Sequence, residues 1–139
     1  MIALVVPLLV WPWVPAWNTD PAQGWGLGSV ALFVLTPITE EILFRGFMQG
    51  WLLNRGWFKK LAAGASRANW CTSIAFACAH AWQHALILVP GYFAVSLLLG
   101  HFRERYRGIL VPVLLHGYYN LGLLLFTACS HFVIGSDIS

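Results

Sequence analysis

Charged residues are scarce in this chain, and acidic residues are the scarcest. Of its 139 residues, 9% are charged and 59% are hydrophobic, with 5 Asp and Glu against 8 Lys and Arg. A soluble domain carries about 25% charged residues, so this chain has too little charge to cover a water-exposed surface. The composition therefore predicts a protein embedded in a lipid bilayer.

Two further shortages exclude other classes of protein. The cysteines Cys71, Cys78 and Cys129 form no C-x-x-C pair, which favours small core residues over a redox or metal role.

The basic residues form two short groups instead of a basic face, so nucleic acid is not an expected partner. Such groups are typical of cytoplasmic loops of membrane proteins. They are Arg55, Lys59, Lys60 and Arg67, followed by Arg103, Arg105 and Arg107.

Long apolar segments predict an all-α fold. Because a bilayer core of about 30 Å needs about 20 helical residues, we expect a polytopic transmembrane bundle of about five helices. The expected helices are 2–17, 26–54, 68–88, 91–103 and 109–133. Pro90-Gly91 is expected to break the chain between the third and fourth helices. The segment 91–103 then either joins Leu86–Val89 to span the membrane or is re-entrant.

The basic loops also predict an orientation. If both lie in the cytoplasm, all helix directions agree with the positive-inside rule. The N-terminus then falls inside, and the turn Asn18–Gly24 falls outside. We expect 1–139 to form a single membrane-embedded domain of an integral, multi-pass protein.

Two of the five acidic residues stand side by side in an apolar segment. Glu40 and Glu41 lie within Val30–Leu53, where a carboxylate costs a few kcal/mol and usually faces a bundle interior or a functional cavity. Glu41 and Arg45 are four residues apart and share a helical face, so they are well placed to pair. Glu40 is turned about 100° away from Glu41. This division predicts that Glu40 faces a functional site.

Polar clusters recur on two further helices. Phe76 and His80 lie one turn apart on the third, and His116 and Asn120 share a face of the fifth. A lone intramembrane His is more often a packing residue than a catalyst. Glu, His, His and Asn at similar depth on three helices instead favour one shared site. His84 follows His80 by four residues and is expected to line that site as well.

These clusters, in this order, resemble the CPBP family of CAAX prenyl proteases and bacteriocin-processing enzymes. The signature of that family is E-E-x-x-x-R, then F-x-x-x-H, then H-x-x-x-N or H-x-x-x-D, and this chain has all three motifs within about 27–125. The resemblance implies an intramembrane glutamic endopeptidase that needs no cofactor and cuts a membrane-associated protein or peptide. The small size of the chain suggests a processing enzyme of a prokaryotic cytoplasmic membrane.

The resemblance also implies a role for each site residue. Glu40 would be the general base that activates water, and His80 would help to hold that water. His116 and Asn120 would donate hydrogen bonds to the oxyanion of the tetrahedral intermediate. The supporting residues would be Glu41, Arg45, Phe76 and His84.

Other functions fit the same residues. Glu40, His80 and His116 with one water would make a catalytic zinc site, although the chain has no H-E-x-x-H helix. Buried Glu and His also form proton relays in transporters, but no inverted repeat is visible. A catalytically inactive scaffold or immunity protein is the remaining alternative, although every motif position keeps its reactive residue.

Overall fold

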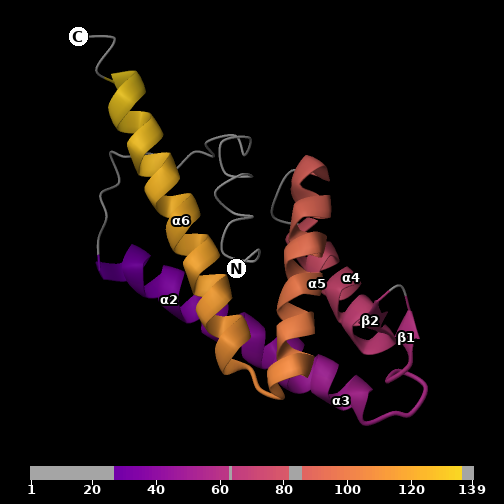
Figure 1. The fold of residues 1–139 in the computed structure, drawn as a ribbon. Helices are drawn as coiled ribbons and strands as arrows, with labels where there is room; N and C mark the ends of the chain where they lie inside the picture. Colours follow the sequence, from indigo (N-terminus) through magenta and orange to yellow (C-terminus); the bar gives the residue numbers. More distant parts are fainter. Residues whose placement is uncertain (1–26, 63, 82–85, 136–139) are drawn as a thin grey trace. The chain divides into compact units, whose positions relative to one another are not determined.

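The structure is a computed structural model that describes residues 27–62, 64–81 and 86–135. This part of the chain is helical apart from one short hairpin (Figure 1). Three sequence predictions lie outside the described residues: the first helix 2–17, the turn Asn18–Gly24, and His84 as part of the site. By its contacts the chain divides into two units, Ile38–Leu114 and the residues that flank it, and each is considered by itself.

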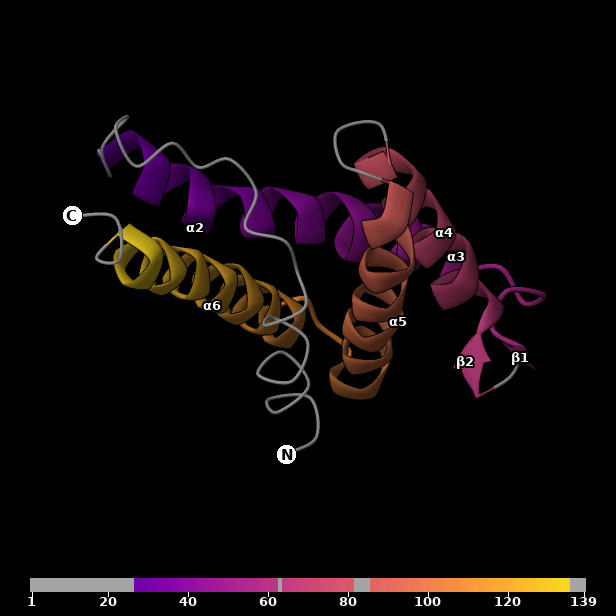
Figure 2. The same cartoon turned by 90° about the horizontal axis from the view of Figure 1, so that it is seen from above.

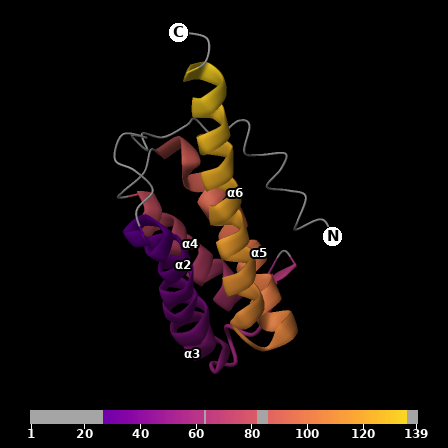
Figure 3. The same cartoon turned by 90° about the vertical axis from the view of Figure 1, so that its left-hand side faces the viewer.

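One continuous helical run carries the first motif. Helix α2 (Leu27–Glu41) leads directly into the π-helix η3 (Ile42–Gln49) and then into α3 (Gly50–Leu53) (Figure 3). The extent of the predicted helix 26–54 is confirmed. Its middle, however, is wound with i→i+5 hydrogen bonds, a geometry that occurs often at functional sites.

The basic connection after this run contains a hairpin that the sequence analysis missed. Strand β1 (Leu61–Ala62) pairs antiparallel with β2 (Ala65–Ser66). Gly64, in the turn between them, has φ of 83°, a conformation that glycine adopts without steric cost. The described residues are mostly helical, as the all-α prediction expects, and this short hairpin is the exception among them. Strands of two residues are too short to produce a recognisable alternation of apolar and polar residues.

Helices α4 (Arg67–Ala81) and α5 (Val89–Tyr106) pack side by side within Ile38–Leu114 (Figures 1 and 2). A single turn of 3-10 helix, η4 (Leu86–Leu88), leads into α5. The predicted third helix 68–88 is confirmed up to Ala81, residues 82–85 lie outside the described part, and Leu86–Leu88 differ from the prediction in forming a separate 3-10 turn. Pro90 does not break the chain. It lies in the first turn of α5, where a missing backbone N–H costs no helical hydrogen bond.

The segment Leu86–Tyr106 is long and apolar enough to cross a membrane. It has 21 residues and a mean hydropathy of 1.5, and it is the one candidate span found among the described residues. At 1.5 Å per residue it covers about 32 Å, close to the thickness of a bilayer core. The helical extension through Leu86 that the spanning alternative requires is present, and that the segment spans the membrane stays a prediction. The bundle of about five spans stays a prediction.

The interior of Ile38–Leu114 is unusually polar, and its surface is apolar. Fully or almost fully buried polar side chains include Glu41, Arg45, Gln49, Asn69, Thr72, Ser73 and Ser96. Large apolar side chains such as Leu43, Phe47 and Ile74 are instead more than half exposed. Soluble domains show the opposite distribution. A bilayer accepts apolar side chains on the outside, and polar residues join its helices from within.

A close approach between α4 and α5 depends on Gly100. A Cβ atom at this position would lie 1.9 Å from Oδ1 of Asn69, so no larger residue fits without movement. Asn69 also donates a hydrogen bond of 2.9 Å from Nδ2 to the backbone carbonyl of Leu97. Small residues of this kind let membrane helices approach closely enough for such bonds.

Helix α6 (Leu110–Gly135) carries the third motif and agrees closely with the predicted helix 109–133. The first and second motifs lie in Ile38–Leu114, whereas His116 and Asn120 belong to the other unit. The prediction of one domain over 1–139 stays a prediction.

Candidate active site

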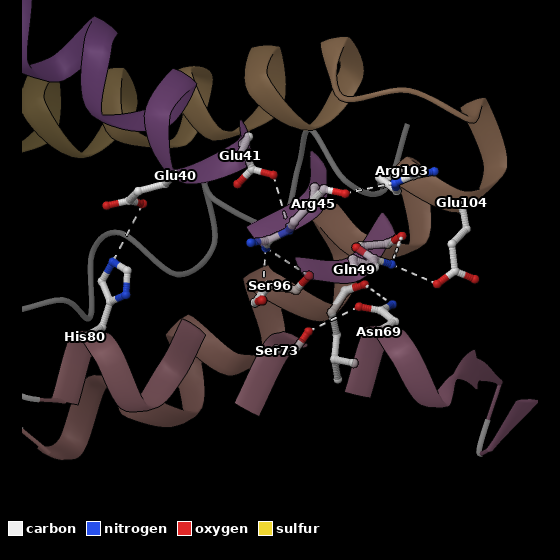
Figure 4. A network of polar contacts seen from close by, with 12 residues as sticks. Glu40, Glu41, Arg45, Gln49, Asn69, Ser73, His80, Ser96, Arg103 and Glu104 are labelled. Carbon is white, nitrogen blue, oxygen red and sulfur yellow. Dashed lines mark hydrogen bonds and ion pairs between the residues drawn. The ribbon is translucent and has the colours of Figure 1, made fainter. Parts of the chain in front are cut away.

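The adjacent glutamates lie in different surroundings (Figure 4). Glu41 is fully buried, and its Oε2 lies 3.2 Å from Nε of Arg45, also fully buried. The Glu40 side chain is 24% exposed, and its Oε2 lies 3.9 Å from Nε2 of His80. The spacing of the first motif predicted this division. The structure adds that Glu40 of α2 and His80 of α4 lie next to each other.

Arg45 is held by more than its ion pair. Its Nη2 donates to the Ser96 hydroxyl at 2.9 Å and to the Ser96 carbonyl at 3.3 Å. Its guanidinium also lies over the Phe76 ring, with Cζ 4.8 Å from the ring centroid. A buried ion pair is stable only when further hydrogen bonds and good geometry compensate for lost hydration. Ser96 and Phe76 supply that compensation from α5 and α4.

The π-helix keeps a polar stripe aligned. Every fourth residue from Pro37 is buried, which places Glu41, Arg45 and Gln49 on one face. In an α-helix a four-residue repeat drifts by about 40° per step, because one turn takes 3.6 residues. The wider π-turn counters this drift. Gln49 thereby reaches α5, where its Nε2 donates to the Gly100 carbonyl at 3.2 Å.

Arg103 contacts the backbone of the π-helix. Its Nε donates a hydrogen bond of 3.1 Å to the carbonyl oxygen of Arg45. The sequence analysis placed Arg103 in a cytoplasmic basic group and assigned it no contact. Its position on α5 instead makes it a support of the first motif.

A second polar cluster surrounds Glu104. Its Oε1 accepts hydrogen bonds from Gln49 Nε2 at 2.8 Å and from the Ser66 hydroxyl at 2.5 Å. The Ser66 hydroxyl in turn accepts from the backbone N–H of Asn69 at 3.0 Å. These contacts join η3, β2, α4 and α5. These contacts were not predicted from the sequence. Gln49 continues the four-residue spacing of Glu41 and Arg45, and this spacing could have indicated that Gln49 is buried on the same face.

The geometry of His80 defines the role of each ring nitrogen. Nδ1 lies 2.9 Å from the carbonyl oxygen of Phe76. A carbonyl oxygen can only accept, so in this hydrogen bond Nδ1 carries the proton. In the neutral ring Nε2 then holds a lone pair, and Nε2 is the atom that faces Glu40.

Aromatic rings surround the imidazole. The Phe76 ring stacks on His80 with a centroid separation of 4.2 Å, and Phe44 meets Phe76 edge-on at 5.1 Å. The Tyr92 ring, from α5, lies 4.7 Å from His80. Phe76 therefore contacts both the Arg45 guanidinium and the His80 ring, which links the two glutamate sites.

The third motif lies on α6. His116 and Asn120 are one turn apart, and His116 is buried. The convergence of this face with Glu40 and His80 stays a prediction. Among the described residues, no group of three or more His, Cys, Asp and Glu side chains is close enough together to hold a metal ion. The zinc alternative with Glu40, His80 and His116 is tested by experiment below.

Comparison with known proteins identifies the family. The model of the type II CAAX prenyl endopeptidase Rce1-like family matches residues 22–122. The chain belongs to this family. The resemblance to CAAX prenyl proteases inferred from the three motifs is thereby confirmed. The Rce1-like proteins form a protease family and are membrane-embedded. Membrane embedding agrees with the polar interior and the apolar surface of Ile38–Leu114.

A curated relative is found in Escherichia coli. Over 91 residues, or 65% of this chain, the sequence is 36% identical to a protein described as "Uncharacterized 24.3 kDa protein". The chain spans 39% of the length of that relative. No solved structure matches the chain significantly.

Proposed function

We propose that this Rce1-like chain is an intramembrane endopeptidase of the glutamic type. It hydrolyses a peptide bond of a membrane-associated protein or peptide near the membrane, and it needs no cofactor. The observation that carries the proposal is the pairing of a partly exposed Glu40 with Nε2 of His80 beside a fully buried Glu41–Arg45 ion pair.

Glu40 and His80 are suited to hold the attacking water. Their 3.9 Å separation is too long for a direct hydrogen bond. One water molecule contacts both atoms at about 2.8 Å, an ordinary distance for a bridging water. It donates one hydrogen to the Glu40 carboxylate and the other to the Nε2 lone pair. A lone pair of the water oxygen is then directed at the scissile carbonyl.

We infer the following reaction, in which the roles of His116 and Asn120 are those that the family resemblance implies. As the water oxygen attacks the carbonyl carbon, Glu40 takes up its proton as general base. His116 and Asn120, one turn apart on α6, donate hydrogen bonds to the oxyanion that forms. Glu40 then transfers the proton to the leaving amide nitrogen as the C–N bond breaks. The carboxylate is restored, so no net proton stays on the enzyme.

Glu41 does not compete for the role of base. Its carboxylate has no exposure to solvent and is engaged by Arg45. Removing one partner of a buried ion pair costs about 3–5 kcal/mol, because the other charge stays buried without compensation. We assign Glu41, Arg45 and Phe76 to maintaining the geometry in which Glu40 meets His80.

The test compares cells that produce the wild type with cells that produce Glu40→Gln. Fragments of membrane proteins that appear with the wild type and are missing with Glu40→Gln identify substrates. A substrate found in this way is then cleaved by the purified protein in proteoliposomes. Identical fragment patterns for both proteins would indicate an inactive scaffold or immunity protein.

A chelator distinguishes the two protease mechanisms. The glutamic mechanism predicts unchanged cleavage after treatment with a zinc chelator. Loss of cleavage on chelation and its recovery on addition of zinc would instead assign Glu40, His80 and His116 to a zinc site.

A further inference from the structure

Tyr92 is an aromatic residue next to the candidate site that belongs to none of the three motifs. It lies on α5, at the start of the candidate membrane span, and is partly buried. Its ring centroid is 4.7 Å from that of His80, with an angle of 34° between the ring planes. Tyr92 and His80 lie in the same unit, Ile38–Leu114.

The contacts of His80 come from two helices. Within α4, the Phe76 carbonyl binds Nδ1 and the Phe76 ring stacks on the imidazole at 4.2 Å. The torsion χ2 of His is broad and roughly two-fold, so a ring held from one helix retains rotational freedom about χ2. Tyr92 contributes a second aromatic ring from α5, which restricts that rotation.

We propose that Tyr92 is a positioning residue of the candidate site. Its ring holds the His80 imidazole in the orientation that directs Nε2 toward Glu40 and Nδ1 toward the Phe76 carbonyl. The expected effect on catalysis rests on the proposed function, whereas the effect on the orientation of His80 does not. The contact on which this role rests is the one between the Tyr92 and His80 rings.

The neighbouring residue Phe93 offers a matched control. It is an aromatic residue on the same helix, but its ring packs against Trp70 at a centroid separation of 5.6 Å. Replacement of Phe93 by Leu therefore removes an aromatic ring of similar size from α5 without removing a ring that contacts His80.

The kinetic test uses the full chain in proteoliposomes with the variants Tyr92→Leu, Tyr92→Phe and Phe93→Leu. A displacement of about 1 Å at a catalytic group lowers rates by about 100-fold, and we expect Tyr92→Leu to lower kcat by about 10- to 100-fold. KM should stay near the wild-type value, because the proposed role of Tyr92 concerns the orientation of the His80 ring and not the binding of substrate. Phe93→Leu should retain kcat, and Tyr92→Phe, which keeps the ring, should retain clearly more of it than Tyr92→Leu. Retained kcat in Tyr92→Leu, or an equal loss in Tyr92→Phe, would overturn the proposal.

A second readout does not depend on activity. The ¹⁵N chemical shifts of the His80 imidazole report which nitrogen carries the proton, and the signal is assigned by its loss in His80→Gln. At a pH at which the ring is neutral, the wild type, Tyr92→Phe and Phe93→Leu should show the Nδ1-protonated tautomer alone. Tyr92→Leu should show a mixture of both tautomers. A single Nδ1-protonated tautomer in Tyr92→Leu would overturn the positioning role.

The kinetic and the ¹⁵N measurements test the proposed function and the role of Tyr92 separately. If the wild type cleaves no substrate, the proposed function fails, and the tautomer measurement still decides the role of Tyr92. If Tyr92→Leu does not fold, Tyr92→Met replaces it, because Met keeps much of the side-chain volume without a ring. The same outcomes then apply to Tyr92→Met.

Discussion

The Glu41–Arg45 and Glu40–His80 pairs begin one residue apart on the same helix but differ in almost every physical respect. Glu41 and Arg45 are both fully buried, 3.2 Å apart, and tied to α5 through Ser96. Glu40 and His80 are partly exposed and 3.9 Å apart. A closely paired, buried carboxylate stabilises the fold, whereas a loosely paired and accessible one has room for water. The difference between the pairs therefore predicts which glutamate acts in catalysis.

The largest expected effect comes from Glu40→Gln. The amide cannot accept the proton of the attacking water, so cleavage should fall by up to about 10⁴-fold, the upper range for loss of a general base. The fold should be kept, because the Glu40 side chain is partly exposed and Gln is of similar size. The measurement is the rate of fragment formation in proteoliposomes, with the thermal unfolding midpoint as the control for folding. Cleavage at the wild-type rate in this variant would remove Glu40 from the role of base.

Glu41→Gln should affect mainly stability. It leaves the Arg45 charge buried without its partner, and we expect a loss of about 3–5 kcal/mol in the free energy of unfolding. Thermal or denaturant unfolding of the protein in detergent micelles measures this loss. A variant as stable as the wild type would show that the buried ion pair does not support the fold.

Gly100→Ala tests the packing of the helices that hold both pairs. The new Cβ would lie 1.9 Å from Oδ1 of Asn69, so either the Asn69 side chain must give up its hydrogen bond to the Leu97 carbonyl or the helices must move apart. Overpacking of this kind costs about 1–3 kcal/mol of unfolding free energy. Gly91→Ala, also in α5, is the control, because a Cβ there meets no described atom within 4 Å. Equal stability of both variants would contradict the close approach of the two helices.

Arg103→Ala should have the smallest effect. It removes the hydrogen bond from Nε of Arg103 to the Arg45 carbonyl in the π-helix. A hydrogen bond from a charged group contributes roughly 1.5 kcal/mol or somewhat more, and we expect a loss of that size in unfolding free energy. Arg105→Ala removes a neighbouring exposed arginine and should leave stability unchanged. If both substitutions have the same effect, Arg103 does not support the π-helix.

The sequence predicted the division of the two glutamates because local spacing determines it. Glu41 and Arg45 share a face at a separation of four residues, in an α-helix or a π-helix alike. The helical extents 26–54 and 109–133 were also predictable, since long apolar segments define them. The residues matched by the Rce1-like family, 22–122, include all three motifs.

Other features depend on tertiary structure or on unusual backbone geometry. The sequence analysis assumed an α-helical period, so it could not identify the π-helix Ile42–Gln49. Tyr92, Ser96 and Arg103 reach the site from α5, and their contacts depend on how α5 packs against α4 and η3. Pro90 was taken as a break because proline interrupts helix interiors. Its place in the first turn of α5 depends on where that helix begins.

The central claim is that Glu40 is the base and Glu41 a structural partner of Arg45. The most direct measurement is the rate of substrate cleavage per folded molecule for Glu40→Gln and Glu41→Gln, in proteoliposomes below the unfolding temperature of both. The account predicts that Glu40→Gln has almost no activity, whereas Glu41→Gln, per folded molecule, loses part of the wild-type rate through altered geometry but stays well above Glu40→Gln. Full activity of Glu40→Gln beside an inactive but folded Glu41→Gln would contradict it.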